Sequence, residues 1–87
     1  MHLIKLSQAK LDISSIEKYT QDTWGEKQKS KYLSGLNHKL DLIATLPHHG
    51  RFLFVKNGVE CRKITHKEHI IFYKITIESI MIYKIKS

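Results

Sequence analysis

The stretch from His69 to Ile75 constrains the fold more than any other part of the chain. Its residues, His-Ile-Ile-Phe-Tyr-Lys-Ile, are apolar on both alternating faces and rich in β-branched and aromatic side chains. This pattern is typical of an inner strand that is covered on one face and at least partly covered on the other. Polar segments able to form turns flank it, so we expect neighbouring strands on both sides.

Two more strand-like runs lie next to it, at Cys61–Thr65 and Ile80–Ile85. The connections are short, with His66-Lys67-Glu68 as the first turn, and short connections favour antiparallel pairing. The sequence therefore predicts a three-stranded antiparallel meander with His69–Ile75 in the middle.

Two segments further towards the N-terminus have weaker strand patterns. Residues His2–Leu6 mix polar and apolar side chains, which suits a first strand at a sheet edge. The apolar run Phe52–Val55 fits either a short strand or an ordered loop packed on the core. The Asn57-Gly58 pair that follows it is a strong turn signal.

Residues from about Gln8 to about Thr23 have the periodicity of an amphipathic helix. Ser7 is a candidate N-cap, because its hydroxyl can accept a hydrogen bond from a free backbone amide. Tyr19 widens one apolar stripe, which is formed by residues spaced three or four apart: Ala9, Ile13, Ile16, Thr20 and Trp24.

A second helix is predicted from about Glu26 to about Leu46, between Gly25 and the helix-ending Pro47. Its apolar stripe contains Tyr32, Leu36, Leu40 and Ile43. Two helices joined by so short a connection pack antiparallel as a hairpin. The predicted fold is α+β: an N-terminal strand, a helical hairpin and a three-stranded meander, with the helices on one face of the sheet.

The length of 87 residues predicts a single domain, residues 1–87. No apolar run approaches the length of a membrane span, and the single cysteine, Cys61, suits a reducing compartment, so we expect a cytoplasmic protein without a membrane partner. The net charge is +7, and residues 51–87 carry eight Lys or Arg against three acids. Such a balance predicts either an acidic partner, whether nucleic acid or protein, or a solubilising surface.

The basic residues of the predicted sheet are interleaved with tyrosines. The patch comprises Arg51, Lys56, Arg62, Lys63, Lys67, Lys74 and Lys84, with Tyr73 and Tyr83. Side chains alternate between the faces of a strand, so Arg62 is separated from Lys63. From this patch we predict a partner-binding surface made of Arg51, Arg62, Lys63, Lys74, Tyr83 and Lys84.

Motifs of catalysis and of cofactor binding are missing from the sequence. It contains no glycine-rich phosphate loop, nucleophile elbow or paired carboxylates of defined spacing. Four histidines, His48, His49, His66 and His69, could be drawn as a metal site, but no second type of ligand accompanies them. We therefore predict no catalytic residue, no metal and no cofactor.

Residues spread over most of the chain resemble the RelE/ParE superfamily of bacterial toxins from type II toxin–antitoxin modules, and most closely its ParE branch. The strand His69–Lys74 is similar to the family's His-x-Ile-Phe-Tyr-Arg strand. The other residues of the resemblance are Ala9, Asp12-Ile13, Ile16, Tyr19, Trp24-Gly25, Gln28, Tyr32, Leu36, Ile43-Ala44, Pro47, Gly50-Arg51, Gly58 and Arg62-Lys63.

The resemblance implies a toxin that is neutralised by a cognate ParD-type antitoxin and that inhibits DNA gyrase by protein binding, without being an enzyme. Two alternatives stay open: a RelE-like ribosome-dependent mRNA endonuclease, and a degenerate toxin that only binds its antitoxin. An endonuclease would need a base, an acid and cations, for which Arg62, Lys63 and His66 are the candidates. A protein partner is favoured over direct binding of nucleic acid, which composition leaves open.

The end of the chain departs from the family pattern. Relatives commonly carry Arg, two apolar residues and His in the last strand, followed by a short tail. Here Lys84, Ile85, Lys86 and Ser87 fill those places. We expect this difference to affect toxicity and gyrase binding rather than the fold, and it also removes the His or Tyr that many RNase relatives use near the C-terminus.

Overall fold

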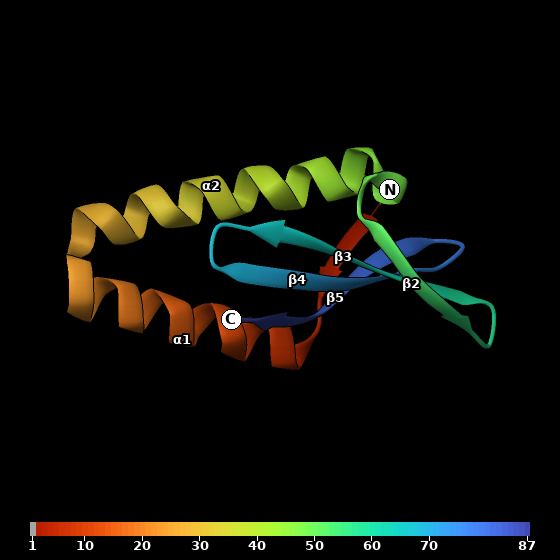
Figure 1. Cartoon of the computed structure of the whole chain (residues 1–87), viewed down its shortest axis with the longest axis horizontal. Helices are drawn as coiled ribbons and strands as arrows, with labels where there is room; N and C mark the ends of the chain where they lie inside the picture. The colour runs from red at the N-terminus through yellow and green to blue at the C-terminus, as the bar shows by residue number, and fades with distance from the viewer. Residues whose placement is uncertain (1) are drawn as a thin grey trace.

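Strand β4, His69–Ile75, lies at the centre of a five-stranded sheet in the computed structural model, which describes residues 2–87 (Figure 1). The strand order is β1-β5-β4-β3-β2, where the other strands are β1 (His2–Lys5), β2 (Arg51–Lys56), β3 (Val59–His66) and β5 (Ser79–Lys86). The predicted meander is confirmed as β3, β4 and β5, each antiparallel to the next. The sheet is wider than predicted, because Phe52–Val55 belongs to a full strand and β1 pairs in parallel with β5.

Two antiparallel helices, α1 (Ser7–Trp24) and α2 (Glu26–Thr45), form the predicted hairpin (Figure 1). They are joined by Gly25, whose φ of 93° lies in the region that favours glycine. A short 3₁₀ turn, Pro47–His49, follows α2 and leads into β2. Within the described residues, neither helix is long and apolar enough to cross a bilayer.

The core lies between the helical hairpin and one face of the sheet. Leu36 and Ile43 of α2 and Tyr73 of β4 are completely buried in it. The buried cluster contains Ala9, Ile16, Tyr32, Leu36, Leu40, Ile43, Ile71, Tyr73, Ile80, Ile82 and Ile85. The four in-register residues of the predicted α2 stripe are therefore confirmed as core, whereas Leu46, which was expected to broaden the stripe, is 53% exposed. The helices cover a single face of the sheet, as expected.

The start of α1 differs from the prediction. Leu6, rather than Ser7, is the N-cap residue, and no side chain caps the helix. The backbone N–H of Leu6 donates to Ile82 O at 2.9 Å, and its carbonyl accepts from Lys10 N at 3.0 Å. Leu6 keeps the extended conformation of β1, and Ser7 is already the first residue of the helix. Ser7 is therefore too far inside α1 to act as its N-cap.

The far end of the α1 stripe is also different. Trp24 is 69% exposed and Tyr19 is 65% exposed, whereas Ile16 and Thr20 are buried. The closed end of the hairpin extends beyond the β3–β4 turn, so no strand covers its last turns (Figure 1). Tyr19 and Trp24, which the periodicity assigns to the apolar stripe of α1, therefore lie outside the core.

Both predicted strand turns are present. Asn57 and Gly58, with φ of 53° and 77°, form the two-residue connection between β2 and β3 that the Asn-Gly pair indicates. His66 pairs with His69, so the β3–β4 turn consists of Lys67 and Glu68, one residue shorter than predicted. Lys67 takes the positive φ, 54°, that this tight turn needs.

Candidate functional site

The register of the sheet separates its residues into a helix-facing side and an uncovered side. Ile71 and Tyr73 of β4 are fully buried against the helices. Phe72 and Lys74 alternate with them and lie on the opposite side. We call this side the open face; on the four C-terminal strands it comprises Arg51, Phe54, Lys56, Val59, Cys61, Lys63, Thr65, Ile70, Phe72, Lys74, Met81, Tyr83, Lys84 and Lys86.

One row of directly opposed residues crosses four strands of the open face. Arg51 of β2 pairs with Lys63 of β3, Lys63 pairs with Phe72 of β4, and Phe72 pairs with Lys84 of β5. Neighbouring strands lie about 4.8 Å apart, so the row spans about 14 Å. The fold thus aligns three cations and one aromatic ring that are distant in the sequence.

A β-bulge adds a second ring to this row. Phe72 pairs with Lys84 and Tyr73 with Ile82, which leaves Tyr83 as an extra residue in β5. Ile82 and Ile85 are both buried. Tyr83 and Lys84 therefore share the open face, although strict alternation would have turned one of them towards the helices.

The aromatic rings and ammonium groups of the open face contact each other. Lys74 Nζ lies 5.1 Å from the centroid of the Tyr83 ring, and Lys84 Nζ lies 5.2 Å from that of Phe72. The two ring centroids are 6.1 Å apart. Burial raises the pKa of the Tyr83 phenol, so this hydroxyl is uncharged at neutral pH.

Arg62 is the exception among the six predicted partner-binding residues. It lies on the helix-facing side, opposite Tyr73, with its side chain only 16% exposed. Its Nη1 donates to Gly50 O at 2.6 Å and to His48 O at 3.1 Å, and its Nε is paired with Glu60. The Arg62 guanidinium therefore links the segment after α2 to the sheet by hydrogen bonds. The other five predicted residues share the open face.

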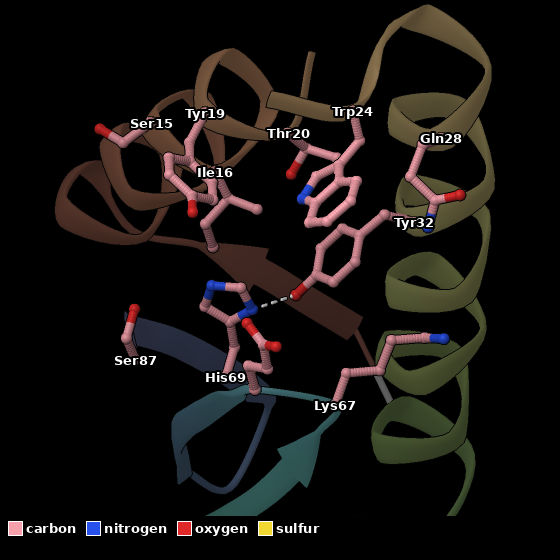
Figure 2. A pocket seen from close by; sticks show the side chains of 11 residues that line it. Ser15, Ile16, Tyr19, Thr20, Trp24, Gln28, Tyr32, Lys67, His69 and Ser87 are labelled. Atoms are coloured by element: carbon pink, nitrogen blue, oxygen red, sulfur yellow. Dashed lines mark hydrogen bonds between the residues drawn. The ribbon is translucent and has the colours of Figure 1, made fainter. Parts of the chain in front are cut away.

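A groove opens on another part of the molecule, between the closed end of the hairpin and the β3–β4 turn (Figure 2). Its volume is about 740 Å³. Aromatic side chains of both helices form much of its wall. The lining residues are Ser15, Ile16, Tyr19, Thr20, Trp24, Gln28, Tyr32, Lys67, Glu68, His69 and Ser87.

A hydrogen bond between α2 and β4 lies inside the groove. The Tyr32 hydroxyl and His69 Nδ1 are 2.5 Å apart, and the two rings meet edge to face (Figure 2). Burial, with a smaller effect of the Glu68 charge, raises the pKa of Tyr32 to about 12. Burial also lowers the pKa of His69, against an opposing effect of Glu68.

His66 lies next to Tyr32 and is 8% exposed. Its ring is 5.3 Å from that of Tyr32, and its Nε2 has no hydrogen-bond partner among the described residues. Burial, followed by the charges of Lys39 and Lys67, lowers its pKa. His66 is therefore a neutral core residue at physiological pH.

The candidate endonuclease residues do not converge. Arg62 and His66 lie on the helix-facing side of β3, whereas Lys63 lies on the open face. Within residues 2–87, no three His, Cys, Asp or Glu side chains are grouped as ligands for a metal ion.

Periodicity placed Tyr19 and Trp24 in the apolar stripe of the first helix but did not locate the groove. A signal was nevertheless present in the resemblance. Six residues that carry it also line the groove: Ile16, Tyr19, Trp24, Gln28, Tyr32 and His69.

Comparison with known proteins identifies the family. A model of the family described as "ParE toxin of type II toxin-antitoxin system, parDE" matches residues 4–87. Toxin ParE1 of Mycobacterium tuberculosis, from strains CDC 1551 / Oshkosh and ATCC 25618 / H37Rv, is 34% identical over 71 residues, which are 80% of this chain and 70% of the relative.

A solved structure shares the fold. A chain of the chromosomal ParDE TA system from P. aeruginosa superposes with a TM-score of 0.80, covering 99% of this chain and 94% of that one, at 16% sequence identity. The family match extends over nearly the whole chain, including both helices, strands β2 to β5 and the second half of β1. The chain therefore belongs to the ParE toxin family of type II toxin–antitoxin systems.

Proposed function

We propose that this ParE-family toxin acts by binding DNA gyrase, without chemistry of its own, and that a cognate ParD-type antitoxin neutralises it. The main support is the separation of the residues that the competing endonuclease would need. A phosphodiester held by Lys63 on the open face would have the sheet between itself and His66. A histidine that is buried, with a lowered pKa, is also a poor source of a proton for a leaving group.

The hairpin groove is the proposed antitoxin site. Trp24 and Tyr19 expose about two-thirds of their surface beside it, and large exposed aromatics are typical anchors of protein interfaces. An amphipathic helix fits between two helices and a turn. The positive net charge favours an acidic partner, in which flexible segments would fold on binding.

Two assays test the activity. Purified protein is expected to inhibit supercoiling of relaxed plasmid by gyrase, and the protein encoded by the neighbouring short reading frame is expected to restore it. A cleavage assay with ribosomes and mRNA is the comparison. Specific cleavage products that disappear in His66→Ala would promote the endonuclease alternative. If neither assay responds but the antitoxin binds, the chain is a degenerate toxin.

Antitoxin binding is tested with one groove variant and one control. Trp24→Ala should weaken binding of the neighbouring gene product at least tenfold in calorimetry, as expected for a central aromatic anchor. Leu11→Ala is the matched control, because Leu11 is an exposed apolar residue of α1, at 63%, that does not line the groove. Equal losses in the two variants would remove the groove from the interface.

A further inference from the structure

The open face is uniformly positive within the described residues. Its cations are Arg51, Lys56, Lys63, Lys74, Lys84 and Lys86. Of the eight acids in the chain, five lie on the helices and two in the strand turns. The eighth, Glu60, points to the helix-facing side, where it pairs with Arg62. No carboxylate therefore neutralises this face from within the sheet.

Like charges are also placed directly opposite each other. Arg51 and Lys63 are cross-strand partners, an arrangement that destabilises a sheet. The bulge at Tyr83 then brings Lys84 to the same row. A bound anion would relieve the repulsion along this row, because it would lie between cations that have no acid to share.

Two flat rings lie within the same cationic field. Phe72 and Tyr83 are partly exposed; their rings contact each other at a centroid distance of 6.1 Å, and an ammonium group lies over each, that of Lys84 over Phe72 and that of Lys74 over Tyr83. Cation–π contacts at exposed sites are weak, and a phosphate oxygen is a stronger partner for an ammonium group. A lysine that turns to a phosphate would uncover the ring beneath it for stacking.

We propose that the open face binds single-stranded DNA, with its backbone along the row from Arg51 to Lys84 and bases stacked on Phe72 and Tyr83. Cations that follow a backbone, interleaved with aromatic platforms, are the usual means of holding a single strand. A duplex would offer its phosphates but not its base faces. An acidic peptide would use the charges and leave both rings without a role.

DNA is chosen over RNA for two reasons. The row contains guanidinium, ammonium and phenyl groups, which cannot accept a hydrogen bond from a ribose 2′-hydroxyl, and on this face the hydroxyls of Tyr83 and Thr65 are the oxygen acceptors that the side chains offer to it. The choice also rests on the proposed function, since the proposed target works on DNA. A toxin seated on gyrase would contact the DNA of that complex through this face.

The first test measures how far binding of the oligonucleotide depends on the cations of the open face. Anisotropy of a labelled oligo-dT probe is followed at several salt concentrations. If the six cations are engaged, log affinity should fall against log salt with a slope of about −4, from about 0.7 per phosphate neutralised. Lys74→Ala/Lys84→Ala should bind about tenfold more weakly and flatten the slope by about 1.4.

The control for this variant keeps the same net charge. Lys10→Ala/Lys27→Ala removes two exposed lysines from the helices and should leave affinity and slope near those of the wild-type protein. Equal effects of the two double variants would mean diffuse attraction to a basic protein, and would overturn the proposal.

The second test measures stacking. Tyr83→Leu keeps the apolar bulk and removes the flat ring, so affinity for oligo-dT should fall about fivefold or more with no change in slope. Tyr19→Leu, an exposed tyrosine of α1, is the control. Circular dichroism and thermal unfolding establish that each variant is folded. Binding that is unchanged in Tyr83→Leu would contradict a stacking surface.

Competitors identify the ligand class. Unlabelled oligo-dT should displace the probe at least as well as oligo-rU, and better than duplex DNA or poly-glutamate. If oligo-rU is the strongest competitor, the face binds RNA instead. If duplex DNA is the strongest, the proposal of a single strand is wrong. If poly-glutamate is the strongest, the face binds an acidic protein. Gyrase inhibition without any oligonucleotide binding would leave the proposed function intact and remove this inference.

Discussion

Tyr32 and His69 join the first half of α2 to the start of the central strand. Their side chains share a hydrogen bond of 2.5 Å between the phenol oxygen and Nδ1, in the groove beside the β3–β4 turn. The pKa of Tyr32 is raised to about 12 and that of His69 is lowered, both mainly by burial. The contact is therefore a hydrogen bond between neutral groups at pH 7, and not an ion pair.

Removing the phenol oxygen should destabilise the fold modestly. Tyr32→Phe keeps the ring in the core but leaves His69 Nδ1 without this partner in a partly buried place. A loss of about 1 kcal/mol in the free energy of unfolding is expected by urea denaturation. Tyr19→Phe, at a position that is 65% exposed, should change the free energy of unfolding by less than about 0.5 kcal/mol. Equal losses would mean that the Tyr32–His69 bond contributes nothing.

The two histidines of β3 and β4 should make the protein sensitive to acid. Burial lowers the pKa values of both His66 and His69 below the ordinary 6.5, so the unfolded chain binds protons more tightly than the folded one. Their contribution to stability is complete above about pH 6.5 and is lost as the pH falls through the folded-state pKa values. Urea unfolding between pH 8 and pH 5 should show a falling midpoint.

The variant His66→Gln isolates one of these groups. It cannot take up a proton, so the midpoint should fall less steeply below pH 6.5 than in the wild-type protein. His38→Gln, in which an exposed histidine of α2 is replaced, should keep the wild-type pH dependence. Parallel curves for wild type and His66→Gln would show that His66 takes no part in the acid transition.

At alkaline pH, by contrast, Tyr32 should make the stability of the protein fall as the pH rises. Its folded-state pKa, about 12, lies above the ordinary value of 10, so its contribution is present below pH 10 and disappears as the pH rises towards 12. The wild-type midpoint should fall in that range, and Tyr32→Phe should remove part of the fall. A Tyr32→Phe protein with an unchanged alkaline transition would contradict this origin.

Truncation of Leu36 on the second helix should be strongly destabilising. It is completely buried in the cluster between the hairpin and the sheet. Leu36→Ala should lower the free energy of unfolding by about 2–5 kcal/mol, a large share of a small domain's stability. Leu11→Ala, on the exposed side of α1, is the control. A loss below about 0.5 kcal/mol at Leu36 would mean that the cavity collapses or is never packed.

Local signals predicted much of this fold. The apolar stretch at His69–Ile75 marks a central strand: the helices cover Ile71 and Tyr73 on one face, and Phe72 on the other face is half-buried. The stripe from Tyr32 to Ile43 faces the core because its period matches the helix. Asn57-Gly58 forms a turn because both residues accept positive φ.

The remaining features depend on contacts between distant segments. Trp24 continues the α1 stripe but has no strand to pack against, and sequence periodicity contains no information on where the sheet ends. The bulge that brings Tyr83 and Lys84 to one face is a property of the β4–β5 register. Five of the six predicted partner-binding residues share a face, two of them, Tyr83 and Lys84, because of this bulge. The carbonyls that hold Arg62 come from a segment whose path the pattern left open.

Substitutions at Gly50 and Tyr73 should be energetically coupled, because the two residues are in close contact. The Tyr73 hydroxyl accepts from Gly50 N at 3.0 Å and donates to Pro47 O at 2.6 Å, which fixes the entry to β2. Gly50 has φ of −70°, so its backbone would accept any residue. A Cβ there, however, would overlap the Tyr73 hydroxyl and lie 2.8 Å from Lys63 O. Gly50→Ala should therefore cost about 1–3 kcal/mol for steric reasons alone.

A double-variant cycle separates this overlap from backbone strain. Tyr73→Phe removes the hydroxyl, so Gly50→Ala/Tyr73→Phe should lose clearly less stability than the sum of the single variants. Gly58→Ala is the control: its Cβ would meet nothing within 4 Å, but its φ of 77° disfavours alanine. That variant should cost about 1 kcal/mol and add to Tyr73→Phe without coupling. Additive losses for Gly50→Ala and Tyr73→Phe in urea unfolding would mean that the chain after α2 moves away from the hydroxyl, and that the close packing at Gly50 does not fix the start of β2.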